Sequence, residues 1–266
     1  MSITSTLVDR AEIRFHEAAE VLHPHVGCFW VVTVERDATI RVVPDGSTSI
    51  SIQLQNGRAS DWELRGPLVR PDERRFASPG SLVGVRLRPG VAFLLSGIAA
   101  HTTVNRRIKL TAEGPFRELI APEPVAKTPL QCIEALQRFL IQRLEHATVH
   151  DSVANAIDEI ERAHGLSRVS DVAARCGISA RHLNRLMRLW IGYGTKVFAS
   201  IVRFQATLRE IDHSPGQSGA TLASETGYFD QAHLTLALGR FAGDTPRRLA
   251  SASVSDFSKT RCDDVL

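Results

Sequence analysis

The sequence lacks any hydrophobic run long enough to cross a membrane. None of its stretches approaches the ~18 uninterrupted apolar residues that a membrane-spanning helix needs. The first residues, MSITSTLVDRAEIRFHEAAE, also lack the basic start and apolar core of a secretory signal. We therefore expect a cytoplasmic protein that has no membrane among its partners.

Cysteine is scarce and widely spaced. The chain holds four cysteines, Cys28, Cys132, Cys176 and Cys262, and no two of them form a CxxC pair. This spacing argues against a zinc knuckle and against a disulfide framework. We expect buried or idle thiols in a reducing compartment.

Familiar catalytic motifs are absent too. The chain has no Ser-His-Asp order, no Walker loop and no GxGxxG after a predicted strand. Gly192-Tyr193-Gly194 lies between predicted helices, where it indicates a helix end. The sequence therefore gives no positive case for an enzyme or for a cofactor.

A metal site would need more ligands than the sequence brings together. His23 and His25 form an HxH pair, a spacing that can place two imidazoles on one face of a strand. Pro24 separates them, and a complete site would also need His101 or a carboxylate such as Glu63. We therefore expect no metal ion, and a metal-dependent barrel enzyme is the alternative for the N-terminal half.

What the chain does contain is typical of a packed globular protein. Hydrophobic residues make up 43% and charged residues 23% of the 266 positions. These proportions indicate neither disorder nor a fibrous repeat. A single domain usually takes roughly 100–200 residues, so the length predicts two domains.

Short strands and turns dominate the region from about Gly27 to Gly90. Runs rich in β-branched and aromatic residues are GCFWVVTVE, ATIRVVPDGSTSISIQLQ, DWELRGPL and SLVGVRLRPG. Pro44-Asp45-Gly46 inside the second run predicts a turn. Brief strands at this spacing favour a small antiparallel barrel or jelly-roll-like fold. We place this β-rich domain at residues 1–122.

A proline-rich segment, APEPVAKTP, separates the strands from a helical region. Four apolar residues that lie three or four positions apart on one stripe of the next helix are Ile133, Leu136, Leu140 and Leu144. The stripe favours an ordinary core helix, and the seam of a homodimer is the alternative. Another helix follows Asp151. We assign residues 123–164 to a linker and connecting helices.

The helical remainder contains two copies of one unit. VSDVAARCGISARHLNRLMRLWIG and ATLASETGYFDQAHLTLALGRFAG each predict a short helix, a turn with glycine, a capping residue and a second helix. The cap is Ser179 in the first copy and Asp230 in the second. The matched pairs, fifty or fifty-one positions apart, are Ala173 and Ala223, Gly177 and Gly227, His182 and His233, Leu183 and Leu234, and Gly192 and Gly243. This repeat predicts two helix-turn-helix units.

The second helix of the first copy has two distinct faces. The residues at helical spacing that predict a face toward the core are Leu183, Leu186, Met187 and Trp190. The residues on another side are Arg181, Asn184, Arg185 and Arg188. An α-helix fits the major groove of B-DNA, where arginine can pair with guanine and asparagine with adenine. We expect this face, with Ser179 and His182 beside it, to read DNA; a merely solvated charged face is the alternative.

Positive charge is concentrated in the same part of the chain. Residues 165–250 hold eleven Lys and Arg against six Asp and Glu, a net charge of +5, whereas the remainder carries −2. A local excess of this kind suits a module that binds a polyanion.

The second copy lacks the arginines of the first. The residues that replace them are Ala232, Thr235, Leu236 and Gly239. We expect Gln231, Thr235 and His233 to touch bases or phosphates. Nearby arginines expected to contact the DNA backbone are Arg240, Arg247 and Arg248. The first unit should therefore dominate specificity.

Over roughly residues 167–250 the chain resembles the DNA-binding domain of the AraC/XylS family of transcription regulators. VSDVAARCGISARHLNRLMR matches the first helix-turn-helix of that family, and GYFDQAHLTLALGRFAGDTP matches the second. KVFASIVRFQATLREI, with Arg203 and Phe204, is similar to the long helix that joins them. The resemblance implies that the two units enter successive major-groove segments on one face of DNA. The chain departs from the family at Leu236, where an arginine is usual, and at Thr195, where a proline is common.

The N-terminal part carries a second resemblance. HPHVGCFWVV, RVVPDGSTSISI and LVGVRLRPGVAFLLSGIAA are similar to a sensor-like domain that precedes the DNA-binding module in a subset of these regulators. The resemblance implies a regulatory N-terminal domain and a small-molecule effector.

Together these features predict an α+β protein. An N-terminal small antiparallel β barrel or jelly-roll-like domain precedes a C-terminal all-α domain at residues 165–250, in which a long helix joins two helix-turn-helix units, and residues 251–266 form a disordered tail. We expect a bacterial sequence-specific transcription regulator that binds a double-stranded DNA operator and an effector, with RNA polymerase and a second copy of the chain as further partners. The alternatives are a metal-dependent barrel enzyme fused to a DNA-binding tail and a regulator that responds to a protein.

Overall fold

The computed structural model describes residues 3–8, 11–55, 58–76, 79–120, 128–214 and 216–244. Its N-terminal part consists mainly of antiparallel strands. The strands are β1 (Ile3–Val8), β2 (Ala11–His16), β3 (Val26–Val34), β4 (Ala38–Val42), β5 (Thr48–Gln55), β6 (Arg58–Ala59), β7 (Glu63–Arg65), β8 (Asp72–Phe76), β9 (Gly80–Leu87) and β10 (Arg107–Lys109).

The strands divide into a main sheet and a separate ribbon. The main sheet has the order β1-β2-β3-β9-β5-β7-β10, with β6 paired to β5, while β4 and β8 form the ribbon. Every pair is antiparallel, as the sequence predicts. The predicted barrel is not closed, because the edge strands β1 and β10 do not pair with each other in the described part of the chain.

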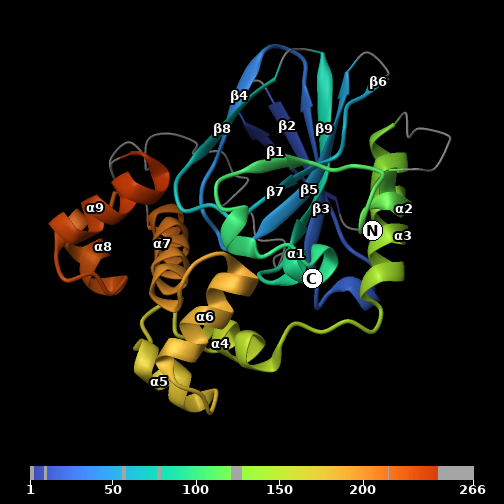
Figure 1. Cartoon of the computed structure of the whole chain (residues 1–266). Helices are drawn as coiled ribbons and strands as arrows, with labels where there is room; N and C mark the ends of the chain where they lie inside the picture. Colours follow the sequence, from blue (N-terminus) through green and yellow to red (C-terminus); the bar gives the residue numbers. More distant parts are fainter. Residues whose placement is uncertain are drawn as a thin grey trace.

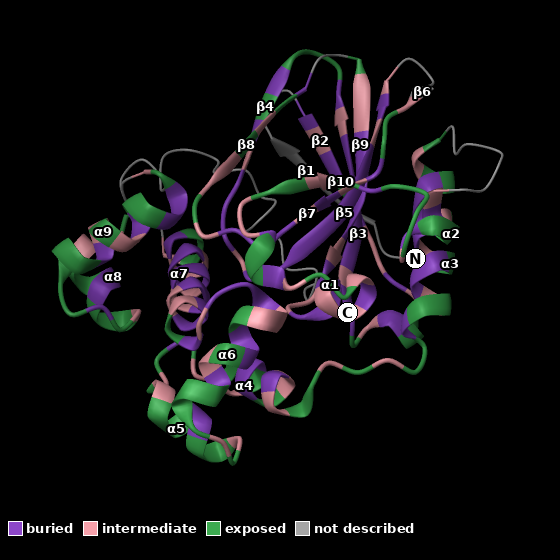
Figure 2. Cartoon of the chain, viewed as in Figure 1, coloured by how far each residue is buried: buried purple, intermediate pink, exposed green. Residues whose placement is uncertain are grey.

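Both faces of the main sheet are covered, which explains why the central strand β3 is buried along most of its length. Side chains alternate between the two faces of a strand. Phe29 and Val31 of β3 pack in one core, whereas Trp30 and Val32 pack in another. Figure 2 shows the resulting run of buried positions along β5 and β3.

α3 (Pro129–Leu144) covers one of these faces and packs along β9. It begins with a capping box: the Gln131 N–H donates to Thr128 Oγ1 over 3.3 Å, and the Thr128 N–H donates to Gln131 Oε1 over 3.1 Å. The stripe Ile133-Leu136-Leu140-Leu144 is buried in the core beneath it. The interpretation as a core helix is confirmed, so this stripe does not provide a dimer seam.

Short helices complete the N-terminal part, and longer ones form the C-terminal part. Those of the N-terminal part are η1 (Glu20–Leu22), α1 (Val91–Ser96), η2 (Ala100–Thr102) and α2 (Arg117–Ile120). Those of the C-terminal part are α4 (Asp151–Arg162), α5 (Val169–Arg175), α6 (Ala180–Ile191), α7 (Thr195–His213), α8 (Gly219–Glu225) and α9 (Gln231–Ala242). Among the described residues, no helix has both the length and the apolarity needed to cross a membrane.

α7 is the central helix of the C-terminal part (Figure 1). Its residues Phe198 and Phe204 are fully buried, and α4 contributes Val153 and Ile160 to the same core. The segment predicted as a linker with connecting helices therefore divides: α3 packs on the sheet, and α4 packs with the helices that follow it.

The two parts of the chain share an interface. On α7, Gln205 Nε2 donates a hydrogen bond to the Pro44 carbonyl oxygen over 2.6 Å. The rings of Phe93 and Trp190 meet edge-on with centroids 4.6 Å apart. Val43 of the N-terminal part joins the helical core. Trp190, predicted on the core face of α6, is therefore an interface residue.

Several strands were not predictable from local pattern. β8 has the sequence DERRF, which shows little apolar alternation. It is a strand because all of its residues pair in register with β4, from Val42 opposite Asp72 to Ala38 opposite Phe76.

The cysteines differ from one another. Cys132 and Cys176 are free thiols, and burial raises the pKa of Cys132 to about 11. Cys28 is bonded in a disulfide, so the expectation of idle thiols is wrong for this residue. Cys262 and the predicted disordered tail lie outside the described residues.

Candidate nucleic-acid interface

The predicted repeat is present as two matching helix pairs, α5–α6 and α8–α9 (Figure 1). In both, a glycine just past the first helix has a positive φ: 68° at Gly177 and 73° at Gly227. The next residue donates its backbone N–H to the carbonyl of the buried alanine five positions back, Ala173 or Ala223. Glycine is the preferred residue at such a helix end, because the left-handed backbone conformation is strained for residues that have a Cβ atom.

The second helix of each unit is capped as predicted. Ser179 Oγ accepts the His182 N–H over 3.2 Å, and Asp230 Oδ1 accepts the His233 N–H over 2.7 Å. The second turn contains one residue more than the first, which accounts for the slip between fifty and fifty-one.

α7 joins the two units, and Arg203 on this helix links both of them. Its guanidinium donates to the Gly165 carbonyl over 2.8 Å, ahead of the first unit, and to the Gly227 carbonyl over 3.2 Å, in the turn of the second. It also lies 5.6 Å from the centre of the Tyr228 ring. Arg203 therefore helps to fix the second unit relative to the first.

α6 exposes a basic face. Leu183 and Met187 are fully buried, while Arg181, Arg185 and Arg188 are exposed. These arginines line one shallow hollow together with Ser179, His182 and Asn184, and no acidic residue lines it. Among the described residues, none of the three arginines forms an ion pair. Their charge is available to a polyanion.

His182 and Arg185 lie next to each other on this face. Arg185 Nη2 is 3.3 Å from His182 Nε2, one helical turn away. The imidazole is thereby placed to orient the guanidinium across the hollow.

Asn184, predicted on the same face, also lines the hollow, but its side-chain amide is bonded within the protein. Its side chain is partly buried, and its Nδ2 donates to the Ala180 carbonyl over 3.0 Å. Its Oδ1 accepts the N–H of Thr195 over 3.0 Å, at the first residue of α7. Asn184 therefore accepts the first N–H of α7 and ties the start of that helix to α6, while it remains in the lining of the hollow.

The matching face of α9 is less basic. Gln231 is exposed, but the Thr235 hydroxyl donates back to the Gln231 carbonyl over 2.8 Å. Leu236, which matches Arg185, is 74% exposed. His233 packs edge-on against the Tyr228 ring with centroids 5.2 Å apart, so its imidazole supports the turn.

Two further features complete the second unit. Phe229, the residue by which the second turn exceeds the first, is 92% exposed. Sequence reasoning missed it, and the only indication was the one-residue slip between the two copies. Arg240 is exposed, with its guanidinium 4.9 Å from the centre of the Phe241 ring. Arg247 and Arg248, predicted to contact the DNA backbone, lie outside the described residues.

Among the residues that the structure describes, no group of three or more His, Cys, Asp or Glu side chains is arranged to hold a metal ion. The HxH pair of the N-terminal part therefore has no third ligand there. His23 Nε2 lies 3.1 Å from the Ala18 carbonyl oxygen, and His25 is buried. Burial lowers the pKa of His25, and a hydrogen bond with the Leu144 backbone partly offsets that.

Two protein-family models match the sequence. A domain of unknown function, DUF6597, matches residues 14–109, and a helix-turn-helix domain matches residues 172–252. No curated protein matches the chain.

Similar solved structures include ToxT from Vibrio cholerae, with a TM-score of 0.47 and 8% sequence identity. The match covers 85% of this chain and 98% of the ToxT chain. ToxT of strain SCE256 with an unsaturated fatty acid bound has a TM-score of 0.42 at 8% identity and covers 84% of this chain and 94% of its own. The AraC-like transcriptional activator CuxR has a TM-score of 0.23 at 12% identity and covers 96% and 87%.

The helix-turn-helix match spans both structural units, from within α5 to beyond α9, and the DUF6597 match spans the sheet from β2 to β10. The chain therefore carries a DUF6597 domain followed by an AraC-type double helix-turn-helix domain, and it is a DNA-binding transcription regulator.

Proposed function

We propose that the first helix-turn-helix unit supplies the direct base readout of this regulator. The observation that carries the proposal is the basic face of α6, where Arg181, Arg185 and Arg188 are exposed without an ion pair among the described residues. Guanidinium groups pair bidentately with the O6 and N7 acceptors of guanine in the major groove. The resemblance at the sequence level supports the same use of this helix.

The spacing of these arginines suits neighbouring base pairs. Positions 181 and 188 are seven residues apart, or about 10 Å along the axis of an α-helix. This length corresponds to about three steps of 3.4 Å in B-DNA. One helix can therefore address about three consecutive base pairs.

The second unit has a different role in this proposal. Gln231 and Thr235 touch a base edge or a phosphate, and Arg240, Arg247 and Arg248 contact phosphates, which adds affinity without sequence information. Leu236 and Phe229 offer apolar contact to a thymine methyl group. The second unit thus contributes more to positioning than to discrimination.

The N-terminal part, up to about residue 122, is the sensor in this proposal, and residues 165–250 contact the operator. The hydrogen bond between Gln205 and Pro44 and the packing of Trp190 on Phe93 support such coupling, since they join the sheet to α6 and α7. We propose a small-molecule effector for the sheet domain. Contact with RNA polymerase and pairing of two copies remain predictions.

The test is binding of the purified full chain to DNA fragments from its own genome, followed by titration with the Arg185→Ala variant. Loss of a bidentate contact should cost about 1–3 kcal/mol on the preferred fragment. Arg138→Ala is the matched control, because Arg138 is an exposed arginine on α3, away from the basic face. Full sequence preference in the Arg185→Ala protein would refute the role of this residue.

A further inference from the structure

A gap lies between the main sheet and the ribbon of β4 and β8, in the core formed by alternate residues of β3. Its apolar lining includes Trp30 on the sheet and Ile40 and Phe76 on the ribbon. Its polar lining consists of Ser49, Ser51, Arg65, Asp72, Arg74 and Arg107. Of its three arginines, Arg65 and Arg74 are half-buried and Arg107 is exposed. Charged groups are buried at a cost unless they are paired, so the partners of the two half-buried guanidiniums matter most.

The register of the sheet places arginines side by side. Ser49 on β5 pairs with Arg86 on β9 and with Arg65 on β7, and Arg65 pairs in turn with Arg107 on β10. Directly opposite residues of neighbouring strands point to the same face. One row across the sheet therefore carries three arginines, and like charges in such positions destabilise a sheet unless anions compensate them.

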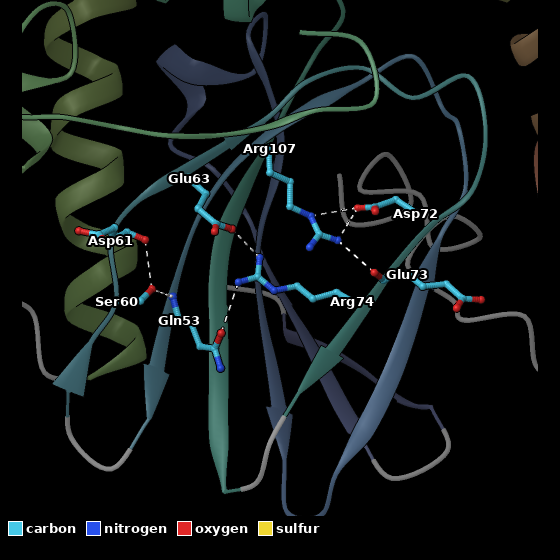
Figure 3. Close-up of polar contacts among 8 residues, drawn as sticks. All are labelled: Gln53, Ser60, Asp61, Glu63, Asp72, Glu73, Arg74 and Arg107. Atoms are coloured by element: carbon cyan, nitrogen blue, oxygen red, sulfur yellow. Dashed lines mark hydrogen bonds and ion pairs between the residues drawn. The ribbon is translucent and has the colours of Figure 1, made fainter.

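Carboxylates compensate all but one of the arginines around the gap. The ion pairs are Arg86 with Asp45 at 2.5 Å, Arg107 with Asp72 at 2.6 Å, and Arg74 with Glu63 at 2.9 Å. In Figure 3, Arg74 reaches from the ribbon to Glu63 on the main sheet, and Arg107 turns toward Asp72 on the ribbon.

Arg65 is the exception. Among the described residues, no side chain or backbone group forms a hydrogen bond or an ion pair with its guanidinium. Burial lowers the pKa of Arg65, while the charges of Asp45 and Asp72 oppose that effect. Asp45 already pairs with Arg86 through Oδ2 and accepts from Ser47 through Oδ1, so its single negative charge is matched by Arg86. The row is one negative charge short.

A carboxylate supplies the missing charge in a suitable shape, because its two oxygens match the fork of a guanidinium. Ser49 lies directly opposite Arg65 on β5, and Ser51 lies opposite Glu63. Both serines line the gap and add hydroxyl donors. Trp30, Ile40 and Phe76 offer an apolar surface beside the charge. We propose that this gap binds a small monocarboxylate with an apolar body, whose carboxylate pairs with Arg65 and whose entry is transmitted to α7. The inference rests on the proposed role of the sheet domain as the sensor.

The size of the gap suggests how binding is transmitted. Its cavity volume is about 30 Å³. A carboxylate head fits that space, so an apolar body must displace the ribbon. β4 of the ribbon carries Arg41, which is 3.5 Å from Asp244 beyond α9, and continues into the turn whose Pro44 carbonyl is bound by Gln205 of α7.

The experiment measures thermal unfolding of the full chain with phenylacetate and 3-methylbutanoate, each against its uncharged amide. We expect the acids to raise the unfolding temperature with concentration and the amides to leave it unchanged. Arg65→Gln should weaken binding of the acids on the order of tenfold or more, since a charge-assisted hydrogen bond is lost. Arg106→Gln, an exposed arginine in the same domain, is the matched control and should bind as the wild type does.

Three results would overturn the inference: no shift with either acid, equal shifts with acid and amide, or unchanged binding by a folded Arg65→Gln protein. The comparison of acid with amide uses the wild type alone, so it decides the matter even where the variant fails to fold. DNA affinity is measured in the same samples. A wild type that binds DNA but no acid refutes only this site, whereas one that binds no DNA refutes the proposed function. Acid binding that leaves DNA affinity unchanged refutes the transmission to α7.

Discussion

The two helix-turn-helix units share a scaffold and expose different surfaces. In both, a left-handed glycine ends the first helix, a side-chain oxygen caps the second, and another left-handed glycine closes it, at Gly192 and Gly243. Yet position 185 presents an exposed arginine where position 236 presents a leucine that is 74% exposed. Buried and turn positions therefore specify the unit, and exposed positions of its second helix specify its chemistry.

If the two units share a scaffold, then truncating a matched core residue should destabilise the protein equally in both units. Leu183 and Leu234 are matched residues with 0% exposure. Truncating either to alanine should lower the free energy of unfolding by about 2–5 kcal/mol, because the cavity is surrounded by packed side chains. Urea titration of the two variants checks this. A loss below about 1 kcal/mol in only one unit would show that the scaffolds are not equivalent.

The surfaces can be made alike by a single substitution. Leu236→Arg places a guanidinium where the first unit has Arg185, and we expect tighter DNA binding by up to about 1–3 kcal/mol if it reaches a base. If it reaches only a phosphate, the salt dependence should steepen by about 0.9 in logarithmic slope. Leu236→Gln, which is polar but uncharged, is the control. Weaker binding by Leu236→Arg would show that the leucine itself makes a favourable contact.

In the first unit, a substitution at Asn184 should change stability slightly without changing base preference. Asn184→Ala removes the acceptor for the Thr195 N–H and the donor to the Ala180 carbonyl. The free energy of unfolding should fall by about 0.5–1.5 kcal/mol, while base preference stays the same. Unfolding and competition with altered duplexes measure the two properties. Loss of preference at one base pair without loss of stability would instead support direct contact with adenine.

The sequence was sufficient where the determinants are local. Caps, turn glycines and helical apolar stripes act within a few residues, so the roles of Ser179, Asp230, Gly177 and Gly227 follow from the sequence alone. The exposure of Arg181, Arg185 and Arg188 followed from the same periodicity.

It was insufficient where the determinants are distant in the chain. Asn184 shares its spacing with the exposed arginines, and only the path of the chain after Gly192 brings the start of α7 to its side chain. The row of Ser49, Arg65 and Arg107 exists because three strands meet in one register, which the pattern of any one strand does not reveal. β8 of the ribbon was missed for the same reason, whereas the run that contains β4 was predicted.

Selection of binding sites from randomised duplexes, done in parallel with the wild type, Arg185→Ala and Leu236→Ala, tests the central claim most directly. We predict two half-sites about one helical turn apart, one strongly and one weakly specified. Arg185→Ala should flatten the strong half-site, and Leu236→Ala should leave it intact. A wild type without preference for any duplex over competitor at physiological salt, or a selected site that Arg185→Ala leaves unchanged, would contradict the account.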